Sequence, residues 1–245
     1  MPVICKNCGS VVEQNFCPVC GQKKGIQKIT WAFIFREIVH LFTHVEKGFI
    51  FSSVKMFYNP GAFVKSYLDG KRKDKQPPVS FLFIWAAIFL LLRNALISLF
   101  DYKQEVLNTP SFVDEEAALY YYTHVTYITI IYIPLYAAIL RIITGLYRRL
   151  NYAETITICF YGYGIFFFIL FFITLVGGLI FHVNILSNTF NTIGVLSTGI
   201  NAFWQCYSVL KQFELKYALM RSIIMTITGV FIMIKFVELI SFVLM

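Results

Sequence analysis

The sequence VSFLFIWAAIFLLLRNALISLF, residues 79–100, decides the fold class of this chain. It runs for 22 residues and contains a single charged side chain, that of Arg93. A helix needs about 20 mostly apolar residues to cross the hydrocarbon core of a bilayer. The stretch therefore predicts a transmembrane helix.

Further apolar stretches of similar length follow it, at residues 125–147, 156–182, 190–209 and 222–244. In the whole chain 58% of the residues are hydrophobic and only 14% are charged, whereas soluble domains carry about 25% charged residues. We therefore expect an all-α polytopic membrane protein with about five transmembrane helices in residues 79–245. The stretch 190–209 is the weakest because it is rich in Asn, Thr, Ser and Gly, and a re-entrant segment is its alternative.

Charges in the connecting segments predict how these helices are oriented. The connection 101–124 is acidic, the next carries Arg148 and Arg149, the segment 183–189 has no charge, and 210–221 is basic again. Lys and Arg concentrate on the cytoplasmic side of membrane proteins. The alternation predicts a multi-pass protein with a cytoplasmic N-terminus and a C-terminus outside.

Two CxxCG motifs, CKNCG and CPVCG, open the chain and contain the cysteines Cys5, Cys8, Cys17 and Cys20. Two such pairs at this spacing are typical of a closed four-thiolate zinc site. Residues 1–22 are therefore predicted to form a zinc ribbon with one structural Zn²⁺ ion, in which Phe16 packs beneath the metal. Disulfides are the alternative, and the reducing cytoplasm disfavours them.

Residues 23–78 are predicted to be a basic linker followed by helices at the membrane interface. Apolar residues recur every three or four positions from residue 30 to 58, which indicates one amphipathic helix; packing of this helix against the bundle is the alternative. Asn59, Pro60 and Gly61 begin a second, short helix that Gly70 ends. We expect the basic side chains after it to contact anionic lipid headgroups: Lys71, Arg72, Lys73 and Lys75.

An excess of positive charge gathers in this N-terminal part, since residues 1–78 hold 12 Lys and Arg against 5 Asp and Glu. Nucleic acid is the rival explanation of such an excess. A basic segment beside the first span is what a membrane protein carries on its cytoplasmic side. We therefore expect the lipid bilayer, and not nucleic acid, to be the partner of these charges.

Apart from Arg141, which lies near the cytoplasmic end of its span and can reach the interface, three charged side chains lie inside the predicted spans: Arg93, Lys235 and Glu238. Lys235 and Glu238 are three residues apart and share a helical face, so a structural ion pair is the first interpretation. A polar cluster that also includes Arg93 and lines a transport path is the alternative, because intramembrane charges need partners or water.

A third class of function rests on His40 and His44, which lie one helical turn apart with Glu37 a turn before them. A pair of histidines at this spacing can bind a metal in an enzyme. Such sites normally use more histidine or carboxylate ligands, and the other histidines, His124 and His182, are predicted on the opposite side of the membrane. We therefore expect no enzymatic activity, with a membrane metal enzyme as the alternative.

Several segments together resemble a family of uncharacterised bacterial inner-membrane proteins that is defined by a domain of unknown function. They are the motif Phe16–Gln22, the segment from Asn59 to Arg72, the Pro77–Pro78 pair, and Arg148–Arg149 with Tyr152–Glu154. The resemblance extends to about residue 180. It implies an N-terminal four-cysteine zinc ribbon, location in the bacterial inner membrane and no established activity.

The features combine into a prediction of function. A closed metal site offers no coordination position to a substrate, so we expect a docking or assembly factor that brings a cytoplasmic protein partner to the membrane. The alternative is a small transporter or channel subunit that uses the intramembrane charges.

Overall fold

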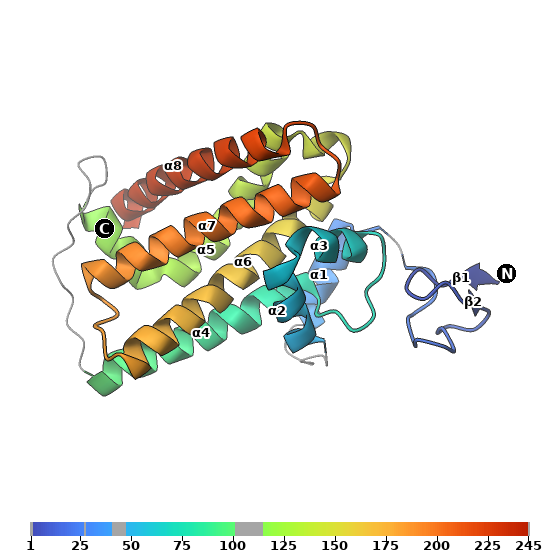
Figure 1. Cartoon of the computed structure of the whole chain (residues 1–245), viewed down its shortest axis with the longest axis horizontal. Helices are drawn as coiled ribbons and strands as arrows, with labels where there is room; N and C mark the ends of the chain where they lie inside the picture. Colours follow the sequence, from blue (N-terminus) through green and yellow to red (C-terminus); the bar gives the residue numbers. More distant parts are fainter. Residues whose placement is uncertain (1, 27, 41–47, 101–114, 245) are drawn as a thin grey trace.

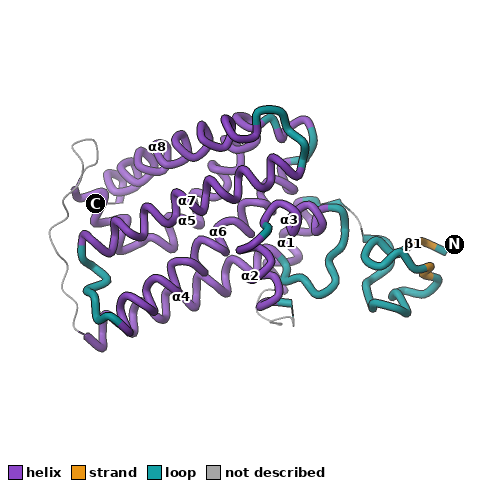
Figure 2. The backbone as a smooth tube through the Cα atoms, in the orientation of Figure 1, coloured by secondary structure: helices purple, strands orange, loops and turns teal. Residues whose placement is uncertain are grey.

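A computed structural model describes residues 2–26, 28–40, 48–100 and 115–244. Its elements, in chain order, are β1 (Val3–Ile4), β2 (Val11–Val12), α1 (Trp31–His40), α2 (Phe49–Tyr58), α3 (Pro60–Leu68), α4 (Pro78–Phe100), α5 (Glu115–Thr144), a 3₁₀ turn (Leu146–Arg148), α6 (Tyr152–Thr174), a π-helical end (Leu175–Ile180), α7 (Asn188–Gln212) and α8 (Ala218–Leu244). Figure 2 shows how completely helices dominate the chain after the N-terminal strands.

Five long helices, α4 to α8, run side by side along the length of the molecule (Figure 1). Within the described residues, four helical segments are long and apolar enough to cross a membrane, namely 78–100, 124–144, 152–180 and 218–240. The predicted class, a helical polytopic membrane protein with an N-terminal cysteine cluster, is confirmed.

The predicted fourth span corresponds to α7, which is a helix of 25 residues but is not among the segments apolar enough to be counted. At about 1.5 Å per residue it is roughly 37 Å long, and it extends beside α6 and α8 in Figure 1. Some of its polar side chains are used inside the bundle. Gln205 donates to the side chain of Asn201 and to the carbonyl of Gly162 in α6.

The short helices pack against one end of this bundle, where aromatic rings from α3, α4 and α6 meet. The Tyr161 ring lies 5.2, 5.4 and 5.6 Å from the rings of Phe63, Tyr67 and Phe81. Its hydroxyl donates to the carbonyl of Gln76, at 2.6 Å. This contact holds the loop before α4 against the core.

The predicted turn signals of this region act as expected. The Asn59 side chain accepts the backbone N–H of Ala62, and Pro60 is the first residue of α3. Gly61 lets α3 approach α7, because a Cβ atom at this position would lie 2.1 Å from the carbonyl oxygen of Ser208. Gly70 follows the end of α3 with a φ of +97°.

The prediction of one amphipathic helix over residues 30–58 is wrong, since α1 and α2 are separate helices. Gly48 precedes α2, and a Cβ atom there would lie 2.3 Å from the carbonyl oxygen of Asp74. Glycine, which has no Cβ atom, allows this close approach of the two backbone segments immediately before α2. Residues 41–47 lie outside the described part of the chain.

Helix α2 buries hydroxyl side chains and exposes apolar ones, the reverse of what a surface helix of a soluble protein does. Ser52 and Ser53 are buried, whereas Ile50 and Val54 are exposed. The buried hydroxyls bind partners from the bundle, because Ser52 accepts the backbone N–H of Gln76 and Ser53 accepts the indole N–H of Trp85. An outward apolar face on a helix too short to span suits the lipid boundary.

Candidate metal centre and the predicted charged sites

The four N-terminal cysteines come from two similar backbone turns, each built around one CxxCG motif. In the first, the backbone N–H of Cys5 donates to the carbonyl of Ser10, and that of Gly9 donates to the carbonyl of Cys5. Antiparallel strands β1 and β2 flank this turn. Gly9 has a φ of +79°, a conformation that glycine adopts without strain.

The second turn repeats these hydrogen bonds around CPVCG. The backbone N–H of Cys17 donates to the carbonyl of Gln22, and that of Gly21, with a φ of +72°, donates to the carbonyl of Cys17. An antiparallel bridge between Phe16 and Lys23 closes the turn. The glycine of each motif thus permits the tight backbone turn around its two cysteines.

The two turns bring all four Sγ atoms within 4.8 Å of one another. The Cys5–Cys20 and Cys8–Cys17 sulfur pairs are both separated by 3.6 Å. This separation is far longer than the roughly 2.05 Å of a disulfide bond. Tetrahedral coordination with metal–sulfur bonds of about 2.3 Å requires sulfur atoms about 3.8 Å apart. The cysteines are therefore arranged to hold a four-coordinate metal ion.

Ser10 adds a polar contact to the sulfur cluster. Its hydroxyl oxygen lies 3.0 Å from the Sγ atoms of both Cys8 and Cys17. Hydrogen bonding from Ser10 lowers the pKa of Cys17 to about 6 and also lowers the pKa of Cys8. The thiolate is the form that binds a metal, so this contact favours the metal-binding form of Cys8 and Cys17, whereas burial and the neighbouring thiols of Cys8 and Cys5 raise the pKa of Cys20 to about 11.

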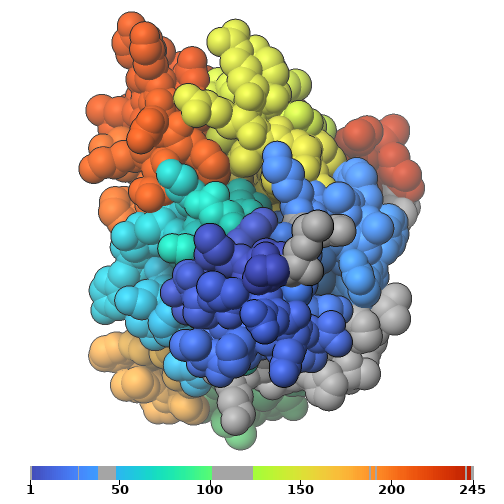
Figure 3. All heavy atoms as spheres, turned by 90° about the vertical axis from the view of Figure 1, so that its right-hand side faces the viewer, coloured from blue at the N-terminus to red at the C-terminus, as the bar shows by residue number. Residues whose placement is uncertain are grey.

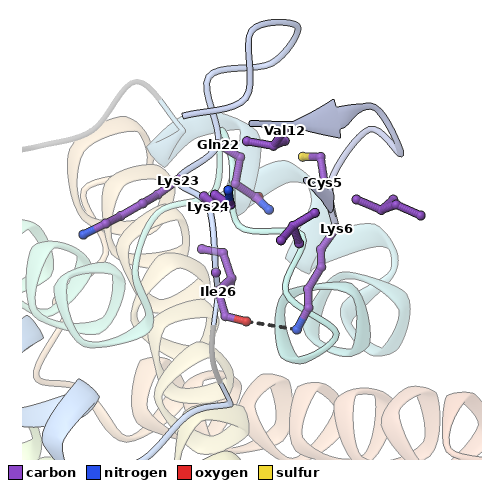
Figure 4. A pocket seen from close by; sticks show the side chains of 10 residues that line it. Cys5, Lys6, Val12, Gln22, Lys23, Lys24 and Ile26 are labelled. Carbon is purple, nitrogen blue, oxygen red and sulfur yellow. Dashed lines mark hydrogen bonds between the residues drawn. The ribbon is translucent and has the colours of Figure 1, made fainter. Parts of the chain in front are cut away.

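The prediction that Phe16 packs beneath the metal is wrong, because 59% of this side chain is exposed. Val12 takes this role instead, packing with Cys5 and Cys17 in the small core of the unit. A cavity of about 50 Å³ lies beside this core and is lined by backbone and side chains that include Lys6, Gln22 and Ile26 (Figure 4). It has room for only a few water molecules, which agrees with a structural site.

We call residues 2–26 the ribbon; it contacts the loop 69–75 between α3 and α4. Gln22 is buried, and its side-chain oxygen accepts the backbone N–H groups of Arg72 and Lys73, at 3.1 and 3.2 Å. On the other side of the loop, a Cβ atom at Gly70 would lie 2.7 Å from the Lys6 side chain. The ribbon is therefore docked on the bundle and is not a free appendage.

The basic residues of this loop have two different surroundings. Lys71 and Lys73 are exposed. Arg72 lies over the rings of Phe33 and Tyr67, at 4.8 and 5.1 Å, and its Nε–H donates to the carbonyl of Tyr67. The guanidinium group of Arg72 is therefore largely engaged in contacts within the protein.

Lys75 is likewise turned toward the protein. Its ammonium group bonds to the Ser66 hydroxyl and lies 5.0 Å from the centre of the Phe63 ring. Burial, reinforced by the charge of Lys71, lowers the pKa of Lys75 to about 8. Of the four basic residues predicted to contact lipid headgroups, Lys71 and Lys73 are thus the ones whose side chains are open to the surface.

The structure does not bring the three predicted intramembrane charges together. Lys235 and Glu238 form an ion pair of 2.7 Å within α8. Arg93 belongs to α4, and α4 and α8 lie at opposite sides of the bundle (Figure 1). Because 53% of the Lys235 side chain is exposed, the pair lies on the outer surface of α8 and gives no support to a polar path through the bundle.

The predicted histidine pair is at the edge of what the structure describes. His40 is the last residue of α1, and His44 lies outside the described residues. Glu37 accepts a hydrogen bond of 3.5 Å from the Tyr67 hydroxyl. Its carboxylate is therefore directed toward the aromatic core beside α3.

Sequence reasoning did not predict the roles of Ser10, which contacts the sulfur atoms, and of Gln22, which binds the loop 69–75. Each is the fifth residue after the first cysteine of its motif, and each carbonyl accepts the N–H of that cysteine. The equal spacing was a usable signal for the shared backbone turn. The side-chain partners could not be read from it, because Gln22 binds a loop about 50 residues away.

Comparison with known families adds one match to this geometry. The model of a family described as "Protein of unknown function (DUF3667)" matches residues 46–90. No curated protein and no solved structure matches the chain. The matched segment contains α2, α3, the loop that receives Gln22 and the first half of α4. It fits the expected resemblance to an uncharacterised family and leaves the activity open.

Proposed function

We propose that this chain is a non-enzymatic docking or assembly factor of the bacterial inner membrane, whose ribbon receives a cytoplasmic protein partner. One observation carries this proposal: the ribbon stands beyond the end of the helix bundle (Figure 1), in front of the short helices when viewed along the bundle (Figure 3). In that position it is presented to the aqueous phase while the bundle holds it at the membrane.

The proposed metal is a single structural Zn²⁺ ion. Four thiolates in tetrahedral reach favour zinc or iron–sulfur chemistry over the hard cations that prefer oxygen ligands. The spacing of the sulfur atoms supports one ion bound by Cys5, Cys8, Cys17 and Cys20. A site with all four positions filled by protein stabilises the ribbon and leaves no position for a substrate.

The proposed orientation places the ribbon in the cytoplasm and the C-terminus outside. The ribbon lies at the same end of the bundle as the turns after α5 and α7 (Figure 1), which carry Arg148, Arg149 and Lys216. The positive-inside rule supports a cytoplasmic location for this end, and the exposed Lys71 and Lys73 suit contact with anionic lipid.

Labelling of single cysteines at Ser10 and Asn108 with an impermeant reagent tests the proposed orientation. We expect labelling in intact cells at position 108 only, and the reverse result refutes this orientation.

The proposed docking surface is the apolar pair Ile4 and Val11. These residues are cross-strand partners in the β1–β2 hairpin and are 70% and 57% exposed. Side chains alternate between the faces of a strand, so this pair points outward because the neighbouring Val12 points toward the sulfur cluster. Lys6 and Lys24 line the small cavity of the ribbon together with Ile4, which supports a partner with an apolar patch and an acidic rim.

A site-specific photo-crosslinker at Val11 tests this surface in native membranes. We expect one defined protein adduct from the full-length chain, lost in an Ile4→Asp variant and in Cys17→Ser, which removes a metal ligand. Lys71→Gln is the matched control, because it alters a charge outside the ribbon and should leave the adduct unchanged. Adducts with lipid alone, or an adduct that persists in Ile4→Asp, would refute the docking surface.

A further inference from the structure

Helix α8 leaves more of its surface uncovered than the other candidate spans. Only 17% of its apolar window is buried, against 28%, 39% and 33% for the windows at 78–100, 124–144 and 152–180. Its outer face carries large exposed side chains, including Met220, Ile224, Ile227, Phe231 and Leu239. In a membrane this face contacts either lipid or another protein.

The ion pair of α8 lies on this uncovered face. Lys235 follows Phe231 by one helical turn and precedes Leu239 by one turn, so the three side chains share a surface. Both apolar neighbours are about 60% exposed, at 59% and 61%. The Lys235 and Glu238 side chains are 53% and 24% exposed, with 2.7 Å between the Nζ and Oε2 atoms.

The position along the helix places this pair within the hydrocarbon layer. Arg221 marks the basic end of α8, where its guanidinium donates to the carbonyl of Thr144, at 2.7 Å. Lys235 is 14 residues further, about 21 Å along the axis, and the hydrocarbon core is about 30 Å thick. Charged side chains at such depth usually face the bundle interior, water or a partner, and Lys235 faces away from its own bundle.

We propose that two copies of this chain associate through the outer face of α8, with Lys235 of each copy beside Glu238 of the other. The interface is a two-fold one, in which the same surface is used on both sides. Each ammonium group then has two carboxylates as neighbours, and the exposed apolar side chains on either side of the pair cover one another. This inference is independent of the proposed docking function.

Charge complementarity identifies a second copy as the occupant. The face carries one cation and one anion, about 4.5 Å apart along the helix axis, so four groups of zero net charge meet in the pair of helices. Two copies insert in the membrane with the same orientation, and their charges are therefore at the same depth without further adjustment. A different protein would need an opposite pair at matching depth.

Exchanging the charges tests the proposal in full-length protein reconstituted into vesicles. The chain carries donor or acceptor fluorophores, and energy transfer is measured over a series of protein-to-lipid ratios. Lys235→Glu alone and Glu238→Lys alone each place like charges across the interface, so we expect self-association to weaken by more than about tenfold. Mixing the two variants restores opposite charges, and we expect energy transfer to return to that of the unaltered chain.

A second pair of variants keeps the test valid should a charge exchange impair insertion. Ile227→Ala removes apolar area from the proposed interface, and Leu91→Ala removes a similarly exposed leucine from α4. We expect only Ile227→Ala to weaken association. The proposal is overturned, in favour of a lipid-covered face, if the unaltered protein is monomeric at every protein-to-lipid ratio. It is also overturned if inserted charge variants associate normally or are not rescued by mixing, or if the two alanine variants have equal effects.

Discussion

Replacing Gln22 by alanine is expected to release the ribbon from the bundle without removing its metal. The Gln22 side chain is 5% exposed, and its oxygen accepts the N–H groups of Arg72 and Lys73. The alanine variant deletes both hydrogen bonds but keeps the backbone carbonyl that binds the N–H of Cys17. The sulfur cluster should therefore remain intact while its attachment weakens.

The size of the effect follows from the number of bonds lost. A neutral hydrogen bond contributes about 0.5–1.5 kcal/mol net, so two bonds contribute about 1–3 kcal/mol to docking. Since about 1.4 kcal/mol corresponds to a tenfold change in an equilibrium constant, the docked state should become roughly 5- to 150-fold less favoured. The lower half of this range is expected, because water replaces the lost acceptor once the loop opens.

Hydrogen exchange measures this change directly at the two affected amides. Exchange of a protected amide reports the local opening equilibrium, so the amides of Arg72 and Lys73 should exchange faster by a similar factor in solubilised protein. Gln14→Ala is the matched control, because Gln14 is an exposed glutamine of the same ribbon. Unchanged exchange at both amides in a metal-loaded Gln22→Ala variant would refute the docking contact.

Three further predictions test the metal, the helix packing and the buried lysine. Purified protein should contain about one zinc ion per chain, and Cys17→Ser should lose it and accelerate exchange in the loop 69–75; disulfides at these cysteines would contradict this. Gly61→Ala should lower the free energy of unfolding by about 1–3 kcal/mol, because its Cβ would lie 2.1 Å from a backbone oxygen of α7. Gly199→Ala, whose Cβ would have no atom within 4 Å, should leave the free energy of unfolding unchanged. Burial lowers the pKa of Lys75 to about 8, whereas it is about 10.4 in the unfolded chain, so the unfolded state binds more protons between these pH values and stability should rise with pH over this range. Lys75→Met should therefore be more stable than the intact protein at pH 7. A melting-temperature difference between the variant and the intact protein that is the same at pH 7 and pH 10 would contradict the titration.

Local rules predicted the features that depend on neighbouring residues. The CxxCG spacing gave the cysteine cluster, because Gly9 and Gly21 permit the turn that brings each pair of thiols together. Asn59 and Pro60 gave the start of α3. Four of the five predicted apolar stretches correspond, among the described residues, to helices long and apolar enough to span, since bilayer thickness sets the number of residues that a span needs.

Long-range contacts decided where sequence analysis was wrong. Gly48 falls within the predicted continuous helix, but the structure begins α2 only after it, at Phe49, and a Cβ atom at Gly48 would lie 2.3 Å from the carbonyl oxygen of Asp74. Phe16 is a large apolar residue of the kind that often lies in a core, yet Val12 packs against the sulfur cluster and Phe16 is exposed. Such choices depend on which segments meet in space, and spacing along the chain does not contain that information.

The charged residues show most clearly what the sequence determined and what the tertiary structure decided. Sequence alone determined that Lys235 and Glu238 share one face of a helix, because three residues make nearly one helical turn. It could not determine whether this face looks into the bundle or out of it, nor that α4, the helix that contains Arg93, lies across the bundle from α8. Only the packing of α8 against α5 and α7 decided that, since a helix that is apolar on all sides gives no periodic signal of which side is covered.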